Sequence, residues 1–181
     1  ASGGAVTVPG KKLVDIAKAL PEGSVVQFKQ DGAQMSLSSG RSRFKLATLP
    51  AADYPRLEIR GDLTTVALAK GPLQDAIGKT QFAMAQQDVR YYLNGMLFET
   101  DANMLRSVAT DGHRLAMSNC HIEQPGLSQR QVIVPRKGVV ELLRLLNEDD
   151  SEVAVAIGNN HIRVETADIV FTSKLVDGRF P

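Results

Sequence analysis

Asp111 and His113 first suggest catalysis, because a carboxylate and an imidazole two positions apart can act as a general acid–base pair. The sequence has no GxSxG or HExxH motif that would add a nucleophile or a set of metal ligands. Asp111-Gly112 is also a strong signal for a tight hairpin turn. We therefore interpret this segment as a turn between two strands and expect the protein not to be an enzyme.

Metal and cofactor chemistry find little support in the residue types. His113, His121 and His161 lack the spacing of metal ligands, and no P-loop or dinucleotide-binding fingerprint occurs. The single cysteine, Cys120, is expected to be a small buried residue at a strand end. One cysteine cannot form an internal disulfide, so we expect a reducing, cytoplasmic location and neither a metal nor a cofactor.

Anion binding is the chemistry that the charges favour. Two helices are expected to begin just after a proline, with Lys11-Lys12 in one and Arg136-Lys137 in the other. Exposed cations at a helix N-terminus oppose the helix dipole and cost roughly 0.3–1 kcal/mol each, whereas an anion is attracted there. Cations at two such positions indicate a site that meets an anion. The residues alone leave open that these side chains only solvate a helix face.

A second polar cluster, QQDVRYY, spans Gln86 to Tyr92. Arg90 offers charge for a phosphate, while the glutamines and tyrosines offer hydrogen bonds and stacking surface for a nucleic acid. Because side chains alternate along a strand, we expect Tyr91 and Tyr92 to point to opposite sides, with one of them packed in the core.

The composition limits the class of protein. The 181 residues include 21 basic and 20 acidic side chains, a net charge of +1, and 43% are apolar. This excludes a disordered chain and a strongly basic nucleic-acid binder, but not one whose charges are sorted onto different faces. No apolar run approaches the roughly 20 residues of a membrane span, and no signal peptide opens the sequence.

An internal repeat sets the order of the elements. The segment Val6–Pro9 (VTVP) returns as Val132–Pro135 (VIVP), and Pro55 returns as Pro181, both at an offset of 126 residues. Apolar residues at i, i+3, i+4 and i+7 then predict a helix in each copy. These stripes are Leu13, Ile16, Ala17 and Leu20, and Val139, Leu142, Leu143 and Leu146. Alternating runs predict strands around Val26–Phe28 and Phe44–Leu46, and around 153–157, 162–164 and 169–171.

A third copy, defined by element order alone, lies between these two. It begins with a strand over 64–69 and a helix from Gly71. The apolar stripe of that helix is Leu73, Ile77, Thr80 and Met84. Three strands are expected to follow, over 92–100, 105–110 and 114–120, and then a linker over 124–130. The prediction is an α+β fold of three β-α-β-β-β units, with sheets on one side and helices on the other.

Five segments of the sequence resemble the β subunit of bacterial DNA polymerase III, the replication sliding clamp. They are Ser39–Pro55, Gln81–Thr100, Val108–Ala116, Val132–Gly138 and Phe171–Pro181. The resemblance implies a DNA clamp fold, in which sheets lie outside and helices line a channel, within a homodimer of three-domain protomers. Residues 1–62 would be the second half of the first domain and 63–181 nearly all of the middle domain. The third domain is expected to be absent, and the chain to be a fragment.

The resemblance also implies a function. It is that of a non-catalytic processivity factor, which encircles duplex DNA without sequence preference and tethers its partners through a peptide-binding groove. The expected partners are the DNA polymerase III alpha subunit, the clamp loader, and other polymerases and repair proteins, with no membrane. Two rivals remain: an enzyme that uses Asp111 and His113, and a protein-interaction domain without a DNA role.

Three groups of site residues follow from the same resemblance. The DNA-binding residues are Lys11, Lys12, Gln86, Gln87, Arg90, Tyr91, Tyr92, Arg136 and Lys137. The partner-peptide groove is formed by Leu93, Thr110, Gly112, His113, Arg114, Leu115 and Pro181, with its remaining wall in the third domain. The dimer interface uses Arg41, Arg43, Phe44 and Leu46. The family often has arginine where Lys11 stands and histidine where Gln86 stands.

Overall fold

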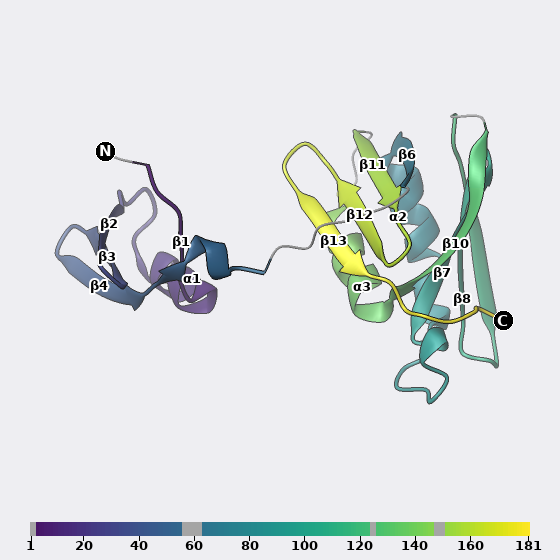
Figure 1. Cartoon of the computed structure of the whole chain (residues 1–181), viewed down its shortest axis with the longest axis horizontal. Helices are drawn as coiled ribbons and strands as arrows, with labels where there is room; N and C mark the ends of the chain where they lie inside the picture. Colours follow the sequence, from purple (N-terminus) through teal and green to yellow (C-terminus); the bar gives the residue numbers. More distant parts are fainter. Residues whose placement is uncertain (1–2, 56–62, 124–125, 147–150) are drawn as a thin grey trace. The chain divides into compact units, whose positions relative to one another are not determined.

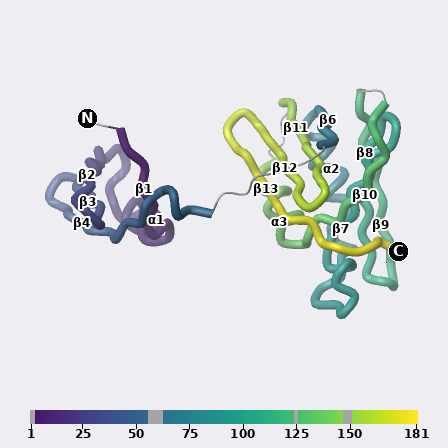
Figure 2. Tube along the Cα trace, viewed as in Figure 1, coloured from purple at the N-terminus to yellow at the C-terminus, as the bar shows by residue number. Residues whose placement is uncertain are grey.

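The computed structural model describes residues 3–55, 63–123, 126–146 and 151–181 (Figures 1 and 2). The chain divides into two compact units, Ala1–Leu57 (unit 1) and Glu58–Pro181 (unit 2). The domain boundary predicted after residue 62 falls at the edge of 56–62, which lies outside the described residues.

Unit 1 contains one helix and two small antiparallel sheets. Its elements are β1 (Val6–Thr7), α1 (Gly10–Ala19), β2 (Gln27–Asp31), β3 (Gln34–Ser39), β4 (Ser42–Ala47), β5 (Leu49–Pro50) and the short 3-10 helix η1 (Ala51–Asp53). One sheet has the order β2-β3-β4, and the other pairs β1 with β5. The predicted strand, helix and following strands are therefore confirmed.

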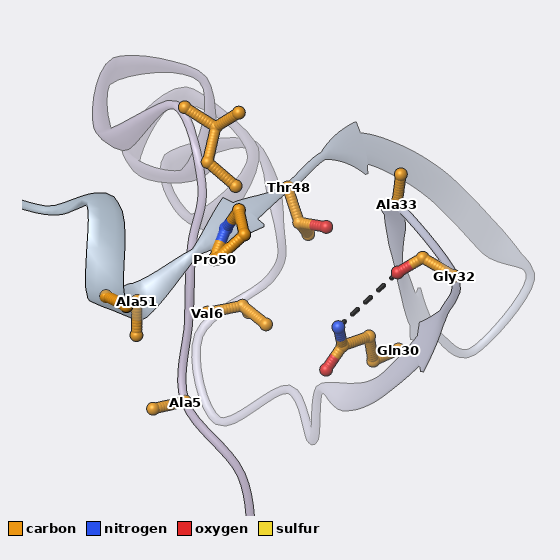
Figure 3. Close-up of a pocket in the computed structure, with 10 residues that line it drawn as sticks. Ala5, Val6, Gln30, Gly32, Ala33, Thr48, Pro50 and Ala51 are labelled. Atoms are coloured by element: carbon orange, nitrogen blue, oxygen red, sulfur yellow. Dashed lines mark hydrogen bonds between the residues drawn. The ribbon is translucent and has the colours of Figure 1, made fainter.

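A cavity of about 590 Å³ separates the β1–β5 pair from the β2–β3 hairpin (Figure 3). Small apolar residues such as Val6 and Pro50 line it, together with the polar side chains of Gln30 and Thr48. The Gln30 side-chain amide is turned back onto its own hairpin, where Nε2 donates to the Gly32 carbonyl at 3.4 Å. Among the described residues, those that line the cavity carry no charged side chain.

Unit 2 is built from two β-α-β-β-β halves that exchange their first strands. The first half contains β6 (Thr64–Ala69), α2 (Lys70–Gly78), the 3-10 helices η2 (Gln81–Ala83) and η3 (Tyr91–Leu93), β7 (Gly95–Ala102), β8 (Met104–Thr110) and β9 (Leu115–His121). The second contains β10 (Leu127–Pro135), α3 (Arg136–Leu145), β11 (Glu152–Ile157), β12 (His161–Glu165) and β13 (Val170–Lys174). The two sheets run β10-β7-β8-β9 and β13-β12-β11-β6, so β6 and β10 each lie in the sheet of the other half.

The core of unit 2 takes side chains from both sheets and both helices. Leu73 of α2, Leu142 of α3, Phe98 of β7 and Val155 of β11 belong to one cluster, and each is at most 1% exposed. Full burial of such a side chain contributes about 1.5–3 kcal/mol. The helices lie against the sheets in Figure 1, so the predicted division into helices and sheets within each half is confirmed.

The predicted helix after Gly71 is shorter than its apolar stripe. α2 ends at Gly78, and Thr80 instead donates its hydroxyl to the Ala76 carbonyl at 2.9 Å. Met84 follows the short helix η2. Both Thr80 (0% exposed) and Met84 (3%) are nevertheless buried, so the stripe identified core residues correctly and the end of the helix wrongly.

Two other boundaries were predicted wrongly. The strand expected from residue 92 begins at Gly95, because Tyr91–Leu93 forms a 3-10 helix. The linker expected over 124–130 becomes strand at Leu127, where β10 pairs with β7 opposite Ala102. Residues 124–125 lie outside the described residues. In the second case, pairing with a distant strand overrides the local turn signal.

Candidate functional site

The two basic helix starts share one local structure. α1 follows Pro9 and α3 follows Pro135, and neither helix has an acidic residue in its first turn or a side-chain cap. Lys11, Lys12 and Lys137 are exposed, and the described residues offer them no ion-pair partner. Each helix therefore presents positive charge where its dipole is also positive.

Arg136 differs from these lysines because it is half-buried. Its backbone N–H donates to the Asn94 carbonyl at 2.9 Å, and its Nη1 lies 3.5 Å from the Met84 carbonyl oxygen. The start of α3 is thereby attached to the segment around residues 84–94. Arg136 has a packing role in addition to its charge.

The segment Gln86–Tyr92, here called the polar loop, is closed at its base by an amide side chain. Asn94 accepts the backbone N–H of Asp88 at Oδ1 (2.9 Å) and donates Nδ2 to the Asp88 carbonyl (2.8 Å). Gln86 and Gln87 are exposed, and Val89 is 95% exposed. The loop thus projects its tip into solvent from a fixed base.

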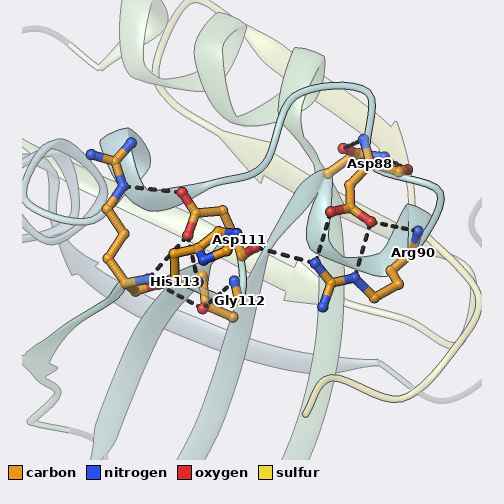
Figure 4. Close-up of polar contacts among 8 residues, drawn as sticks. Asp88, Arg90, Asp111, Gly112 and His113 are labelled. Carbon is orange, nitrogen blue, oxygen red and sulfur yellow. Dashed lines mark hydrogen bonds and ion pairs between the residues drawn. The ribbon is translucent and has the colours of Figure 1, made fainter.

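The Arg90 guanidinium lies between Asp88 and Asp111 (Figure 4). It donates from Nε to Asp88 Oδ1 at 3.0 Å and from Nη2 to Asp88 Oδ2 at 2.8 Å. Nη2 also reaches the Asp111 carbonyl at 3.3 Å. The hydrogen bonds from Arg90 lower the pKa of Asp88 to about 2, and Asp88 in turn raises the pKa of Arg90.

The segment Asp111–Arg114, here called the turn, joins β8 to β9 and confirms the predicted hairpin. Asp111 Oδ1 accepts the backbone N–H groups of His113 and Arg114, each at 3.0 Å. These hydrogen bonds lower the pKa of Asp111, which makes its carboxylate a poorer base. Gly112 has φ +87°, a conformation that favours glycine. Asp111 therefore stabilises the backbone of the turn by accepting the N–H groups of His113 and Arg114 at its Oδ1.

The tyrosine pair was predicted wrongly in its geometry. Tyr91 and Tyr92 belong to η3, so their side chains do not alternate as in a strand. Tyr91 is 57% exposed, Tyr92 is half-buried, and their rings meet edge-on with centroids 5.8 Å apart. Gly178 lies against both, since a Cβ there would be 3.7 Å from each. Neither ring is in the core.

The predicted groove residues differ in exposure. Gly112, His113, Arg114, Leu115 and Pro181 are exposed, with Leu115 at 63%, whereas Leu93 (1%) and Thr110 (7%) are buried. The backbone after β13 crosses the same sheet, where the Val176 N–H donates to the Ile133 carbonyl at 2.8 Å (Figure 1). Of the two buried residues, Thr110 contacts the turn, where its hydroxyl donates to the Arg114 carbonyl at 2.6 Å.

Sequence reasoning missed Phe82, which is 58% exposed beside the turn. The Arg114 guanidinium lies 5.5 Å from the centre of its ring and donates Nη2 to the Phe82 carbonyl at 2.9 Å. Phe82 lay outside the apolar stripe of the expected helix, so the sequence carried no signal for it.

The residues predicted for a dimer interface lie on or beside β4, an edge strand of its sheet. Arg41 and Arg43 are exposed, Phe44 is half-buried and Leu46 is 5% exposed. Arg43 Nη1 donates to the Gly40 carbonyl at 2.8 Å, within its own hairpin. β4 therefore presents charged side chains along an edge that is free for a further strand among the described residues.

Among the described residues, no helix has both the length and the apolar character needed to cross a membrane. Within the same residues, no group of three or more His, Cys, Asp and Glu side chains is placed to hold a metal ion.

Known proteins match both units. The N-terminal domain of the DNA polymerase III beta subunit matches residues 1–58, and its central domain matches residues 67–181. The beta sliding clamps of Pseudomonas aeruginosa and Escherichia coli K12 are 51% and 53% identical to this chain over 178 residues. Each match covers 98% of this chain and 48% of the relative.

Solved structures agree with these matches. The DNA polymerase III subunit beta from Pseudomonas aeruginosa has a TM-score of 0.94 and 51% identity, over 100% of this chain and 50% of that chain. A sliding clamp from the same organism, bound to griselimycin, has a TM-score of 0.91 and 51% identity over 97% of this chain and 48% of that chain. The sliding clamp from Bacillus subtilis reaches 0.90 at 26% identity, over 98% and 47%.

The exchanged β-α-β-β-β halves and the agreement with these structures define an α+β protein with the DNA clamp fold. More specifically, the chain belongs to the DNA polymerase III beta subunit family. The resemblance seen in the five sequence segments is confirmed. The chain spans about half the length of the curated relatives it matches.

Proposed function

We propose that this chain acts as part of a sliding clamp, a non-catalytic processivity factor of bacterial DNA replication. The observation that carries the proposal is the pair of uncapped, basic helix starts at equivalent positions of the repeat, in a chain of this family. Contacts from lysine and arginine to phosphates are independent of sequence and weaken with salt. With few contacts to bases there is no preferred stopping place, so a clamp can slide while its ring keeps it on the duplex.

The second part of the proposal is a docking groove for partner peptides. The exposed parts of Gly112, His113, Arg114, Leu115 and Pro181 would form this chain's share of it, for the polymerase III alpha subunit, the clamp loader and other polymerases and repair proteins. The related clamp bound to griselimycin supports a ligand-binding surface in the family. Burial of roughly 100 Å² of a partner's apolar side chain there would contribute about 2–3 kcal/mol.

The third part is assembly. We propose that the clamp is a cytoplasmic homodimer and that the free edge of β4, with Arg41 and Arg43, faces another subunit. An unpaired edge strand readily adds a further strand, and charged side chains along it select the partner.

A chimera tests the DNA role. Residues 1–181 replace the corresponding segment of the Pseudomonas aeruginosa clamp, and retention on nicked circular DNA is measured after loading. We expect the chimera to stay on circles and to leave linearised DNA. The pair Lys11→Glu and Lys137→Glu should lower the amount of clamp loaded onto nicked circles at least tenfold, because both replace a positive charge at a helix start with a negative one.

The matched control reverses one exposed lysine on a strand of each unit, Lys29→Glu and Lys174→Glu. The control should load as the parent chimera does. Unchanged loading of the helix-start variant would refute the DNA role and favour a protein-interaction domain. A DNA strand cut by the purified chain, and no longer cut after Asp111→Ala, would instead favour an enzyme.

A further inference from the structure

We propose that Arg90 is a positioning residue that fastens the polar loop to the turn, and so couples DNA contact at the loop to peptide binding at the turn. The mechanical link stands on the contacts of Arg90 alone. The coupling of two ligands rests in addition on the proposed function of the two surfaces.

The direction of the guanidinium is set from within the polar loop. Asp88 receives two side-chain hydrogen bonds from Arg90, and its Oδ1 also accepts the Arg90 backbone N–H at 2.8 Å. Asn94 holds the backbone of Asp88 on both its N–H and its carbonyl side. The guanidinium of Arg90 therefore keeps one orientation as long as Asn94 holds the backbone of Asp88.

The turn is shaped to receive that fork. Besides the 3.3 Å contact of Nη2 with the Asp111 carbonyl, a Cβ on Gly112 would lie 3.0 Å from both Nη1 and Nη2. The guanidinium thus occupies the space that a side chain at position 112 would need. Arg114 and Thr110 brace the same turn, since the Thr110 hydroxyl donates to the Arg114 carbonyl at 2.6 Å and accepts the Gly112 N–H at 3.1 Å.

A phosphate near the polar loop competes with this arrangement. It attracts the guanidinium and draws it from Asp111 and Gly112, which changes the turn that a peptide contacts. Linkage is reciprocal, so a peptide that holds the turn also changes the affinity for DNA by the same factor. Lysine at position 90 keeps the charge for a phosphate but cannot bridge Asp88 and Asp111 with a planar fork.

The link is tested first on the chain itself, by its backbone amide NMR signals. Arg90→Lys should shift the signals of Gly112 and His113, more than 20 residues away in sequence. Arg163→Lys is the matched control, because Arg163 pairs with Glu165 on β12, and it should leave both signals in place. Unmoved signals in Arg90→Lys overturn the proposal.

The coupling is tested on the chimera with two probes, griselimycin and a 20-base-pair duplex. We expect saturating duplex to change the Kd of griselimycin at least fivefold, measured by calorimetry, and Arg90→Lys to reduce this change below twofold. Equal coupling in the parent chimera and the lysine variant, or none in the parent, overturns the coupling. If the parent chimera binds neither probe, the proposed function fails, which the amide signals distinguish from failure of the link.

Discussion

Gly95 lies on β7 where it pairs with the exchanged strand β10, and its replacement by alanine is the sharpest test of that junction. A Cβ at position 95 would lie 2.6 Å from the Val134 carbonyl oxygen and 2.8 Å from Ile133 Cγ2. Ordinary contacts are about 3.5–4.0 Å, so β7 and β10 must separate locally. The carbonyl belongs to the β10 backbone and cannot rotate aside. We expect Gly95→Ala to lower the free energy of unfolding by about 1–3 kcal/mol, the usual range for overpacking.

The assay is urea unfolding of the whole chain, followed by circular dichroism. With a slope of roughly 1–3 kcal/mol per molar, the midpoint should fall by about 1 M. The control is Gly78→Ala at the end of α2, where a Cβ meets nothing within 4 Å. Alanine there should stabilise by about 0.4–1 kcal/mol. A midpoint that rises for both variants would refute the close approach of the two strands.

Three further predictions concern other parts of the molecule. Leu142→Ala in α3 removes a side chain that is 1% exposed and should lower the free energy of unfolding by about 2–5 kcal/mol. Ile16 is the equivalent position in α1, a helix without buried residues. Ile16→Ala should therefore lower the free energy of unfolding by less than half as much in the same urea assay. The pKa of Asp88 is lowered to about 2, so its pairing with Arg90 should be complete above the ordinary pKa near 4 and should be lost only as the pH falls through about 2. The signal of the Arg90 backbone amide, which donates to Asp88 Oδ1, should therefore stay constant from pH 8 to 5, and a titration of this signal near pH 4 would contradict the pairing. Leu115→Ala should weaken griselimycin binding by the chimera about tenfold, because a 63% exposed leucine loses apolar area for contact; an unchanged Kd would exclude Leu115 from the groove.

The sequence could predict the elements whose signals are local or repeated, such as the helix starts and the hairpin turn. The equivalent prolines before α1 and α3 placed both helix starts correctly, because proline is favoured where a helix begins and its apolar stripe follows at a fixed period. The Asp111-Gly112 turn was equally accessible, since a positive φ at Gly112 requires the residue type that the sequence shows. In each case the signal lies within about ten residues of the structure it determines.

The sequence could not predict contacts between distant segments. The partner of Arg90 on the turn lies 21 residues further along the chain, and no spacing rule joins the two. The contact of Phe82 with Arg114 spans 32 residues in the same way. The end of α2 was missed because Thr80 and Met84 are buried by other elements while their backbone leaves the helix. Long-range packing, which periodicity does not record, decided each of these features.

The basic starts of α1 and α3 carry the same charges, but the two helices differ in how much apolar surface they bury. Two cations in the first turn cost roughly 0.3–1 kcal/mol each. α3 offsets this by burying Val139 and Leu142, at about 1.5–3 kcal/mol per fully buried side chain, and by the hydrogen bond from Arg136 to Asn94. α1 has the same cost and no buried residue. Cations that would bind an anion can therefore stand at a helix start when the opposite face of the helix is well packed. By this comparison, the cost of the two cations is better offset in α3 than in α1.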